Sequence, residues 1–256
     1  MISLAATFFG LILARVGAFV AMLNVLGAGQ TPRLVKMGLA VGLSSFWATT
    51  LWTQMAGCAW LCSGGNGAWL AYIIALAREV MLGAVIGFTF ELFLLPARVA
   101  GEFLAQELGL TFGNIASATS SGMQSPLTIF LELSASAVFL ALDGHHAFFG
   151  AMDGLFRSYP VAGGGPLFSW EGLVSSTAEA QEWGLMLAGP VALCLFLTTL
   201  MLNLLTRATP QFNLYNVGFP LRLGAGLVAL LLLLPQLIAS FVTILQQGTD
   251  LLGRVF

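Results

Sequence analysis

Long apolar stretches constrain this chain more than any other feature of its sequence. No charged residue stands between Lys36 and Arg78, and none stands between Arg222 and Asp250. Hydrophobic residues make up 58% of the chain and charged residues only 8%, whereas an ordinary globular domain carries about 25% charged residues. The sequence therefore predicts an all-α integral membrane protein. At roughly 20 residues per crossing, its length leaves room for about six long helices, expected as a single membrane-embedded domain over residues 1–256.

The apolar segments are separated by breaks that contain glycine, proline or charge. The expected long helices run from Leu4 to Leu26, from Arg33 onward, from Trp69 to Leu95, from Trp183 to Leu205 and from Leu223 to Ile244. Residues 127–142 are too few for a full crossing. Together with residues 147–159 they are expected to form a broken helix or a helical hairpin. Residues 167–182 are expected to be the most polar connector of the chain.

A short amphipathic helix is predicted between Ala97 and Leu108. Arg98, Glu102 and Gln106 follow one another at i, i+4 and i+8, which places them in one polar stripe of a helix. Pro96 is expected to interrupt or kink the chain just before this helix.

Arg78 and Glu79 lie inside an apolar segment, where each would cost roughly 2.5–3.5 kcal/mol at the bilayer centre. They are expected either near a membrane interface or beside charges on neighbouring helices or subunits. Glu132 is a comparable charge in the segment 127–142. Gly83 and Gly87, like Gly38 and Gly42, have the spacing that lets a second helix approach closely.

The segment 107–126 is not apolar enough for a membrane helix, and it lacks the charges of a typical surface loop. No charged residue occurs between Glu107 and Glu132, yet Gly, Ser, Thr, Ala and Asn dominate its centre. Irregular backbone at membrane depth is tolerated only where protein surrounds it or where it lines a water-filled cavity. The segment therefore lies either in water or inside the protein.

Several function classes are disfavoured by the residues present. A net charge of −2 offers no basic surface for nucleic acid. Ser120 and Ser121 lack a histidine on a later helix that could act as a base, so we expect no catalysis. His145 and His146 are adjacent and are expected to diverge on a helix, so we predict neither a metal site nor a bound cofactor. Cys58 and Cys62 are interpreted as packing residues.

The N-terminus lacks a basic region before its apolar run and is interpreted as a retained helix, not as a cleaved signal.

A small-solute secondary transporter remains possible, because such folds also use broken helices and buried charges. No correspondence between the two halves of the chain favours it.

Four motifs resemble the FliR/SctT family, which belongs to the export gate of bacterial flagella and type III secretion injectisomes. The run R-A-T-P-Q-F-N-L-Y-N-V-G-F-P-L-R at 207–222 resembles its R-x-x-P-Q-x-N-…-G-F-P-L-K signature. The runs at 78–87, 101–112 and 139–146 resemble its R-E-…-G-…-G, G-E-…-M-G-L-S-F and F-L-A-L-N-G-H elements. The Gly-Phe-Pro form at 218–220 is more similar to the flagellar branch than to the injectisome branch, which is the alternative.

The resemblance implies a non-enzymatic subunit of the flagellar export gate in the bacterial inner membrane, within the flagellar basal body. It implies assembly with FliP and FliQ, with FlhB and FlhA nearby, and passage of unfolded export substrates. It also implies that the central loop at 109–125 faces the pore and closes it as a plug, although its run at 116–122 differs from the D-P-Q-S-G-like run of the family. The implied plug residues are Leu110, Phe112, Gly113, Asn114, Ile115, Ser120, Ser121, Gly122 and Met123. The implied assembly or structural residues are Arg78, Glu79, Gly83, Gly87, Glu102, Glu132, Gly144, His145, Arg207, Pro210, Gln211, Asn213, Gly218 and Pro220.

Overall fold

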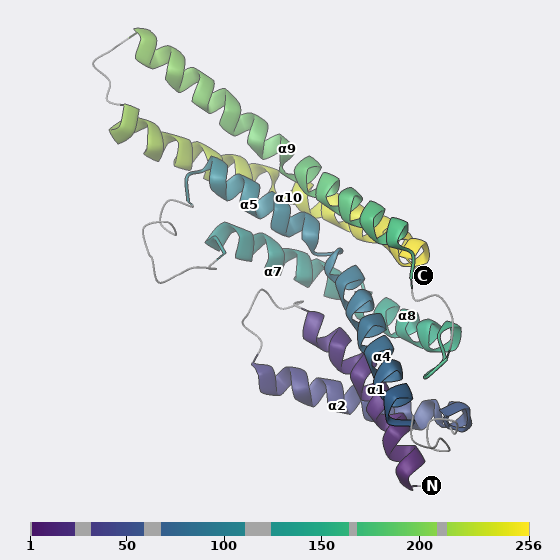
Figure 1. Ribbon diagram of the computed structural model, residues 1–256. Helices are drawn as coiled ribbons and strands as arrows, with labels where there is room; N and C mark the ends of the chain where they lie inside the picture. The colour runs from purple at the N-terminus through teal and green to yellow at the C-terminus, as the bar shows by residue number, and fades with distance from the viewer. Residues whose placement is uncertain are drawn as a thin grey trace. The chain divides into compact units, whose positions relative to one another are not determined.

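The computed structural model describes residues 2–23, 32–58, 68–110, 124–163, 168–208 and 214–255, and in this part of the chain it contains helices and no strand (Figure 1). The helices are α1 (Ile2–Met22), α2 (Arg33–Thr50), the 3₁₀ helix η1 (Trp52–Cys58), α4 (Ala68–Glu91), α5 (Leu95–Glu107), α7 (Pro126–Ala141), α8 (Gly144–Ser158), α9 (Trp170–Ala208) and α10 (Leu214–Val255). The predicted all-α membrane fold is confirmed.

Four helices in the described part are long and apolar enough to cross a membrane, namely α1, α4, α9 and α10. The pair α7 and α8, interrupted at Leu142 and Asp143, would count as a fifth crossing if it forms one broken span. The sequence predicted about six. The segment that begins at Arg33 is not apolar enough to count as a crossing, because the 18 residues of α2 include two cations and four hydroxyl side chains.

Two predicted boundaries were wrong. The expected polar connector at 167–182 is helical from Trp170 onward, because Glu, Ala and Gln support a helix and no glycine or proline stands between Leu173 and Glu182. The last long helix begins at Leu214 rather than Leu223 and continues through Pro220 and Pro235. Prolines are tolerated in membrane helices because neighbouring groups satisfy the backbone carbonyls that they leave unpaired.

The chain divides into two compact units that each draw on separate parts of the sequence. The first unit comprises Met1–Leu92, Asp143–Ser176 and Asp250–Phe256, and its helix α1 packs against both α2 and α4. One face of α1 is buried, through Phe8, Leu11, Ile12, Arg15, Val16 and Phe19. The Phe19 ring stacks on Phe148 of α8 at a centroid distance of 4.6 Å and meets Phe90 of α4 edge-on at 6.1 Å.

The second unit comprises Phe93–Leu142 and Thr177–Thr249, with α5 packed against α7. Three glycines bring its helices together. A Cβ at Gly184 of α9 would lie 2.7 Å from Val99 of α5, and one at Gly226 of α10 would lie 2.2 Å from Leu108. A Cβ at Gly101 of α5 would lie 2.6 Å from the Cα of Thr128 on α7. In lipid such close packing, not the exclusion of water, holds helices together.

Candidate functional site

Helices α5 and α7 form an antiparallel hairpin, and the uncharged segment joins them in the sequence. Gly101 faces Thr128, and Arg98, less than one turn earlier, reaches Glu132, one turn later. The residue numbers of the contacting positions decrease along α5 while they increase along α7, which is the pattern of an antiparallel pair. The hairpin therefore brings residue 110 and residue 124 to the same end of the helix pair. The sequence predicted a broken helix or hairpin from residues 127–142 with residues 147–159 instead, and those two helices, α7 and α8, are bent by 74° at their break.

A buried ion pair fixes this hairpin. The carboxylate of Glu132 has no exposed surface, and its Oε1 accepts a hydrogen bond of 2.9 Å from Nε of Arg98 and a second one from Nη2. The second oxygen, Oε2, has no partner among the described residues. A buried carboxylate is costly unless a partner compensates it, so Arg98 holds Glu132 and with it the register of α5 against α7.

The C-terminus of α5 has a complete glycine cap. Gly109 adopts a positive φ of 75°. Its N–H donates to the carbonyl of Gln106 at 3.0 Å, and the N–H of Leu110 donates to the carbonyl of Ala105 at 2.9 Å. This pair of hydrogen bonds is the Schellman motif, which ends a helix and turns the chain away from it.

The N-terminus of α7 is capped independently of α5. Ser125 has an extended backbone, and its hydroxyl accepts a hydrogen bond of 3.3 Å from the N–H of Thr128. Pro126 occupies the first helical position, where no N–H is needed. The uncharged segment is therefore bounded by two separate capping motifs, one at each end.

Most of the predicted plug residues lie outside the described residues. Leu110 is described and is half-buried at the base of the hairpin tip. Phe112, Gly113, Asn114, Ile115, Ser120, Ser121, Gly122 and Met123 fall in the segment 111–123, which the structure does not describe.

The base of the hairpin tip is tied to α10. Nη2 of Arg222 lies 2.6 Å from Oε2 of Glu107, the last residue of α5, and both side chains are partly exposed. One turn further along α10, Gly226 gives room to Leu108. Arg222 is also the final residue of the 207–222 signature, so the signature and the uncharged segment meet at this ion pair.

The other signature residues are distributed over two helices. Arg207 is exposed in the last turn of α9, and Gly218 is buried near the start of α10. Pro220 is exposed within α10. Pro210, Gln211 and Asn213 lie outside the described residues. On α5, Glu102 and Gln106 are exposed and Arg98 is half-buried, which agrees with one polar stripe on this helix.

In the first unit, Glu79 pairs with a cation of the same chain. Its Oε2 lies 2.5 Å from Nε of Arg15 on α1, and both side chains are 1% exposed. The Glu79 Oε1 accepts a hydrogen bond of 3.1 Å from the N–H of Ala162, which has a φ of 58°. Arg15 also donates to the carbonyl of Tyr159 at 2.9 Å and lies over the Phe156 ring at 4.6 Å.

Sequence reasoning missed Arg15 as the partner of Glu79. The available signal was a lone cation in one apolar helix and an acid in another, since either would be costly alone in the bilayer. Arg78, adjacent to Glu79, is half-buried on α4. Glu79 therefore meets a charge on a neighbouring helix, which is one of the two arrangements expected from the sequence.

The small-residue pairs behave in two different ways. A Cβ at Gly83 would lie 2.0 Å from the carbonyl oxygen of Arg15, and one at Gly87 would lie 2.6 Å from the Cβ of Met22, so α1 passes directly over this pair. A Cβ at Gly38 or Gly42 of α2 would meet no atom within 4 Å. The first pair packs a helix of this chain, whereas the second faces open space.

The adjacent histidines do not diverge as predicted. Their rings lie 4.2 Å apart between centroids, and both reach towards Asp143. The reason is local: Asp143 adopts a left-handed conformation with φ of 56° just before α8, which folds its carboxylate back beside the first turn of that helix. Gly144 begins α8 and is half-buried.

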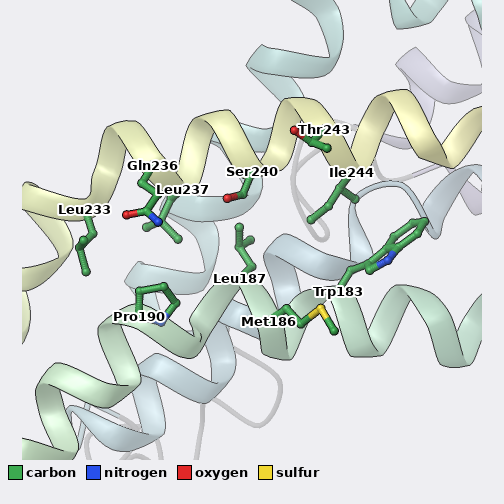
Figure 2. A pocket seen from close by; sticks show the side chains of 10 residues that line it. All are labelled: Trp183, Met186, Leu187, Pro190, Leu233, Gln236, Leu237, Ser240, Thr243 and Ile244. Atoms are coloured by element: carbon green, nitrogen blue, oxygen red, sulfur yellow. The ribbon is translucent and has the colours of Figure 1, made fainter.

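A groove of about 310 Å³ separates parts of α9 and α10 in the second unit (Figure 2). Its lining residues are Trp183, Met186, Leu187 and Pro190 of α9 and Leu233, Gln236, Leu237, Ser240, Thr243 and Ile244 of α10. Three of these side chains are polar and none is titratable. The groove therefore suits an apolar occupant with a few hydrogen-bonding groups, and its lining offers no acid, base or thiol for chemistry.

Comparison with known proteins places these elements in a defined sequence family. The family described as bacterial export proteins, family 1, matches residues 6–248. The flagellar biosynthetic protein FliR of Escherichia coli (strain K12) is 30% identical over 231 residues, which cover 90% of this chain and 84% of that protein. The FliR proteins of Caulobacter vibrioides and Bacillus subtilis (strain 168) are 26% and 24% identical, over 86% and 87% of this chain and 86% and 84% of their own lengths.

Proposed function

The chain belongs to the bacterial export proteins of family 1, and from this membership we propose that it is a non-catalytic subunit of the flagellar type III protein export gate. In this proposal residues 1–256 act as one membrane-embedded export-gate domain. The domain forms part of the channel through which unfolded export substrates pass. The relatives bear the name of a flagellar protein, which favours the flagellar gate over the injectisome gate.

We further propose that the segment 109–125 is the plug of this channel. The supporting observation is the α5–α7 hairpin, in which two independent caps bound the uncharged segment of the sequence. Small residues pack in a narrow lumen and move aside easily, whereas the ring of Phe112 would exclude water and ions. The Glu107–Arg222 pair ties the base of the hairpin tip to α10, so the plug would be anchored at its base and movable beyond it.

The proposed partners are FliP and FliQ, with FlhB and FlhA nearby, in the inner membrane at the flagellar basal body. Large apolar side chains are exposed along α2, α9 and α10, for example Leu34, Met201 and Leu232 at 80%, 70% and 75%. In a membrane such faces contact either lipid or other helices. The open faces of Gly38 and Gly42 support the second possibility for α2, because they leave room for close helix approach.

The plug is tested by deleting Gly113–Ser121 in cells that produce the complete gate. We expect the deletion to raise ion leakage across the inner membrane while FliP and FliQ still co-purify with the chain. Deletion of Ser63–Gly67, another uncharged break in the sequence, serves as the matched control and should leave leakage unchanged. Normal leakage in the Gly113–Ser121 deletion, with intact assembly, would exclude the plug.

The channel role is tested separately by co-purification. An export-gate subunit should co-purify with FliP and FliQ in stable amounts. A secondary transporter should instead be stable alone and should move a small solute when reconstituted as a pure chain. Stable solute transport by the isolated chain would therefore overturn the export-gate proposal.

A further inference from the structure

The chain contains only two histidines, and both lie in one cluster with a carboxylate where α8 begins. Asp143 precedes the helix, and the N–H of His146 donates a hydrogen bond of 2.8 Å to the Asp143 carbonyl. This turn places the Asp143 side chain beside both imidazole rings. The proposed export function gives no role to Asp143 or His146, and it gives His145 only an implied assembly role.

The ligand atoms of the cluster converge. Nε2 of His145 lies 3.9 Å from Oδ1 of Asp143, and Nδ1 of His146 lies 3.8 Å from the same oxygen. Each of the three residues offers one ligand atom that lies within 4.8 Å of those of the other two. Small side-chain rotations would bring them to the roughly 2.0–2.2 Å bonds that Zn²⁺ makes to imidazole nitrogen and carboxylate oxygen.

From this geometry we propose that Asp143, His145 and His146 bind one divalent transition-metal ion, with Zn²⁺ as the representative. Imidazole nitrogens suit zinc, copper, nickel and iron, whereas magnesium and calcium prefer oxygen ligands only. The Asp143 and His146 side chains are both 73% exposed, so the remaining coordination positions would hold water.

The carboxylate is the decisive ligand of this cluster. The cluster lies at the N-terminus of α8, where the helix dipole carries partial positive charge that opposes a cation. Asp143 supplies the compensating negative charge. Substitution by asparagine keeps a residue that tolerates the left-handed backbone and removes the charge alone.

The affinity is expected to be moderate. A metal-binding histidine usually donates its second ring N–H to a nearby acceptor, which orients the ring. Nδ1 of His145 is buried and has no such acceptor among the described residues. The bound ion would itself then fix the orientation of the ring.

The test measures Zn²⁺ binding to the full chain, purified in the assembly that it forms in the membrane through a tag without histidine. Wild-type and variant preparations are titrated in parallel, so that their difference isolates this cluster. We expect about one Zn²⁺ per chain more for wild type than for D143N, or an affinity about 10- to 100-fold lower in D143N. H146A should show the same loss.

Two controls make the result specific. D153N removes a carboxylate from the same helix, where Asp153 pairs with Arg157 at 2.8 Å, and should bind Zn²⁺ like wild type. The C58A/C62A variant should also bind like wild type, which excludes the two cysteines. Thermal unfolding gives a second readout: Zn²⁺ should raise the Tm of wild type and of D153N but not of D143N.

The proposal fails if D143N and H146A bind Zn²⁺ as wild type does. It fails equally if D153N loses as much affinity as D143N, or if wild type gains no Tm in Zn²⁺. In those cases the cluster would be an exposed carboxylate–histidine contact, which contributes little energy. None of these outcomes depends on the export-gate assignment.

Discussion

Glu79 of α4 and Arg15 of α1 form an ion pair of 2.5 Å in which both side chains are buried. The pair also reaches the turn after α8, through the Tyr159 carbonyl and the Ala162 N–H. Each of these charges would be costly in lipid on a lone helix, and each is compensated by the other within the chain. The pair joins α1, α4 and the turn after α8 in the first unit.

Removal of one partner of this pair should destabilise the protein more than removal of both. E79Q leaves Arg15 buried without its partner, which typically costs about 3–5 kcal/mol. The double variant R15M/E79M should recover much of that loss, because no charge remains buried. Unfolding free energies of E79Q, of the single variants R15M and E79M, and of the double variant R15M/E79M, all in detergent, provide the measurement. R33Q, at an exposed arginine of α2, is the control and should stay close to wild type; additive single losses would contradict the coupling.

Gly83 and Gly38 should respond oppositely to alanine. G83A places a methyl group 2.0 Å from the Arg15 carbonyl oxygen, so α1 must move away and the Tm should fall clearly. G38A meets no atom within 4 Å and should gain roughly 0.5–1 kcal/mol of helix propensity. If α2 packs against another subunit, G38A should lower the co-purified yield of the proposed partners FliP and FliQ without lowering the Tm of the chain. An equal fall in Tm for both variants would contradict this distinction.

Glu132 should matter for folding of the α5–α7 hairpin. E132A removes the buried carboxylate that accepts two hydrogen bonds from Arg98, and we expect a loss of about 1.5–3 kcal/mol or a failure to accumulate. E102A removes an exposed glutamate from α5 and should cost less than about 0.5 kcal/mol. Protein yield in the membrane and unfolding in detergent measure both. Equal stability of the two variants would show that the Arg98–Glu132 pair does not hold the hairpin.

The Glu107–Arg222 pair should affect gating more than stability. Partly exposed ion pairs contribute about 0–1 kcal/mol, so R222Q should change the Tm little. If the pair anchors the plug at its base, R222Q should nevertheless raise ion leakage in cells with the complete gate. The charge exchange E107R/R222E should return ion leakage to the wild-type level, because the two side chains still attract each other with their signs reversed. Leakage in the exchanged variant equal to that of R222Q would contradict an anchoring role.

The sequence was sufficient to predict the fold class and most helices, because their apolar length is a strong signal. It predicted the short helix from the spacing of Arg98, Glu102 and Gln106, but it placed the interruption at Pro96, whereas α4 ends at Glu91 and α5 already begins at Leu95. It failed where a polar stretch is helical, as in Trp170–Glu182, since hydropathy does not separate a polar helix from a loop.

The contacts between distant segments were the harder part of the site to predict. Arg15 and Glu79 are 64 residues apart, and single-residue patterns carry no information on which buried charges meet. The convergence of His145 and His146 depends on the backbone of Asp143, whose left-handed conformation a sequence pattern does not reveal. The plug assignment remains a prediction, because residues 111–123 lie outside the described part.

The separate caps at Gly109 and Ser125 have an evolutionary consequence. Each helix of the hairpin ends through hydrogen bonds made by its own residues, so neither end depends on the identity of the residues between them. Insertions, deletions and substitutions between the caps are therefore expected to leave the hairpin folded. If that segment is the plug proposed above, selection can act on it for its effect on permeability alone.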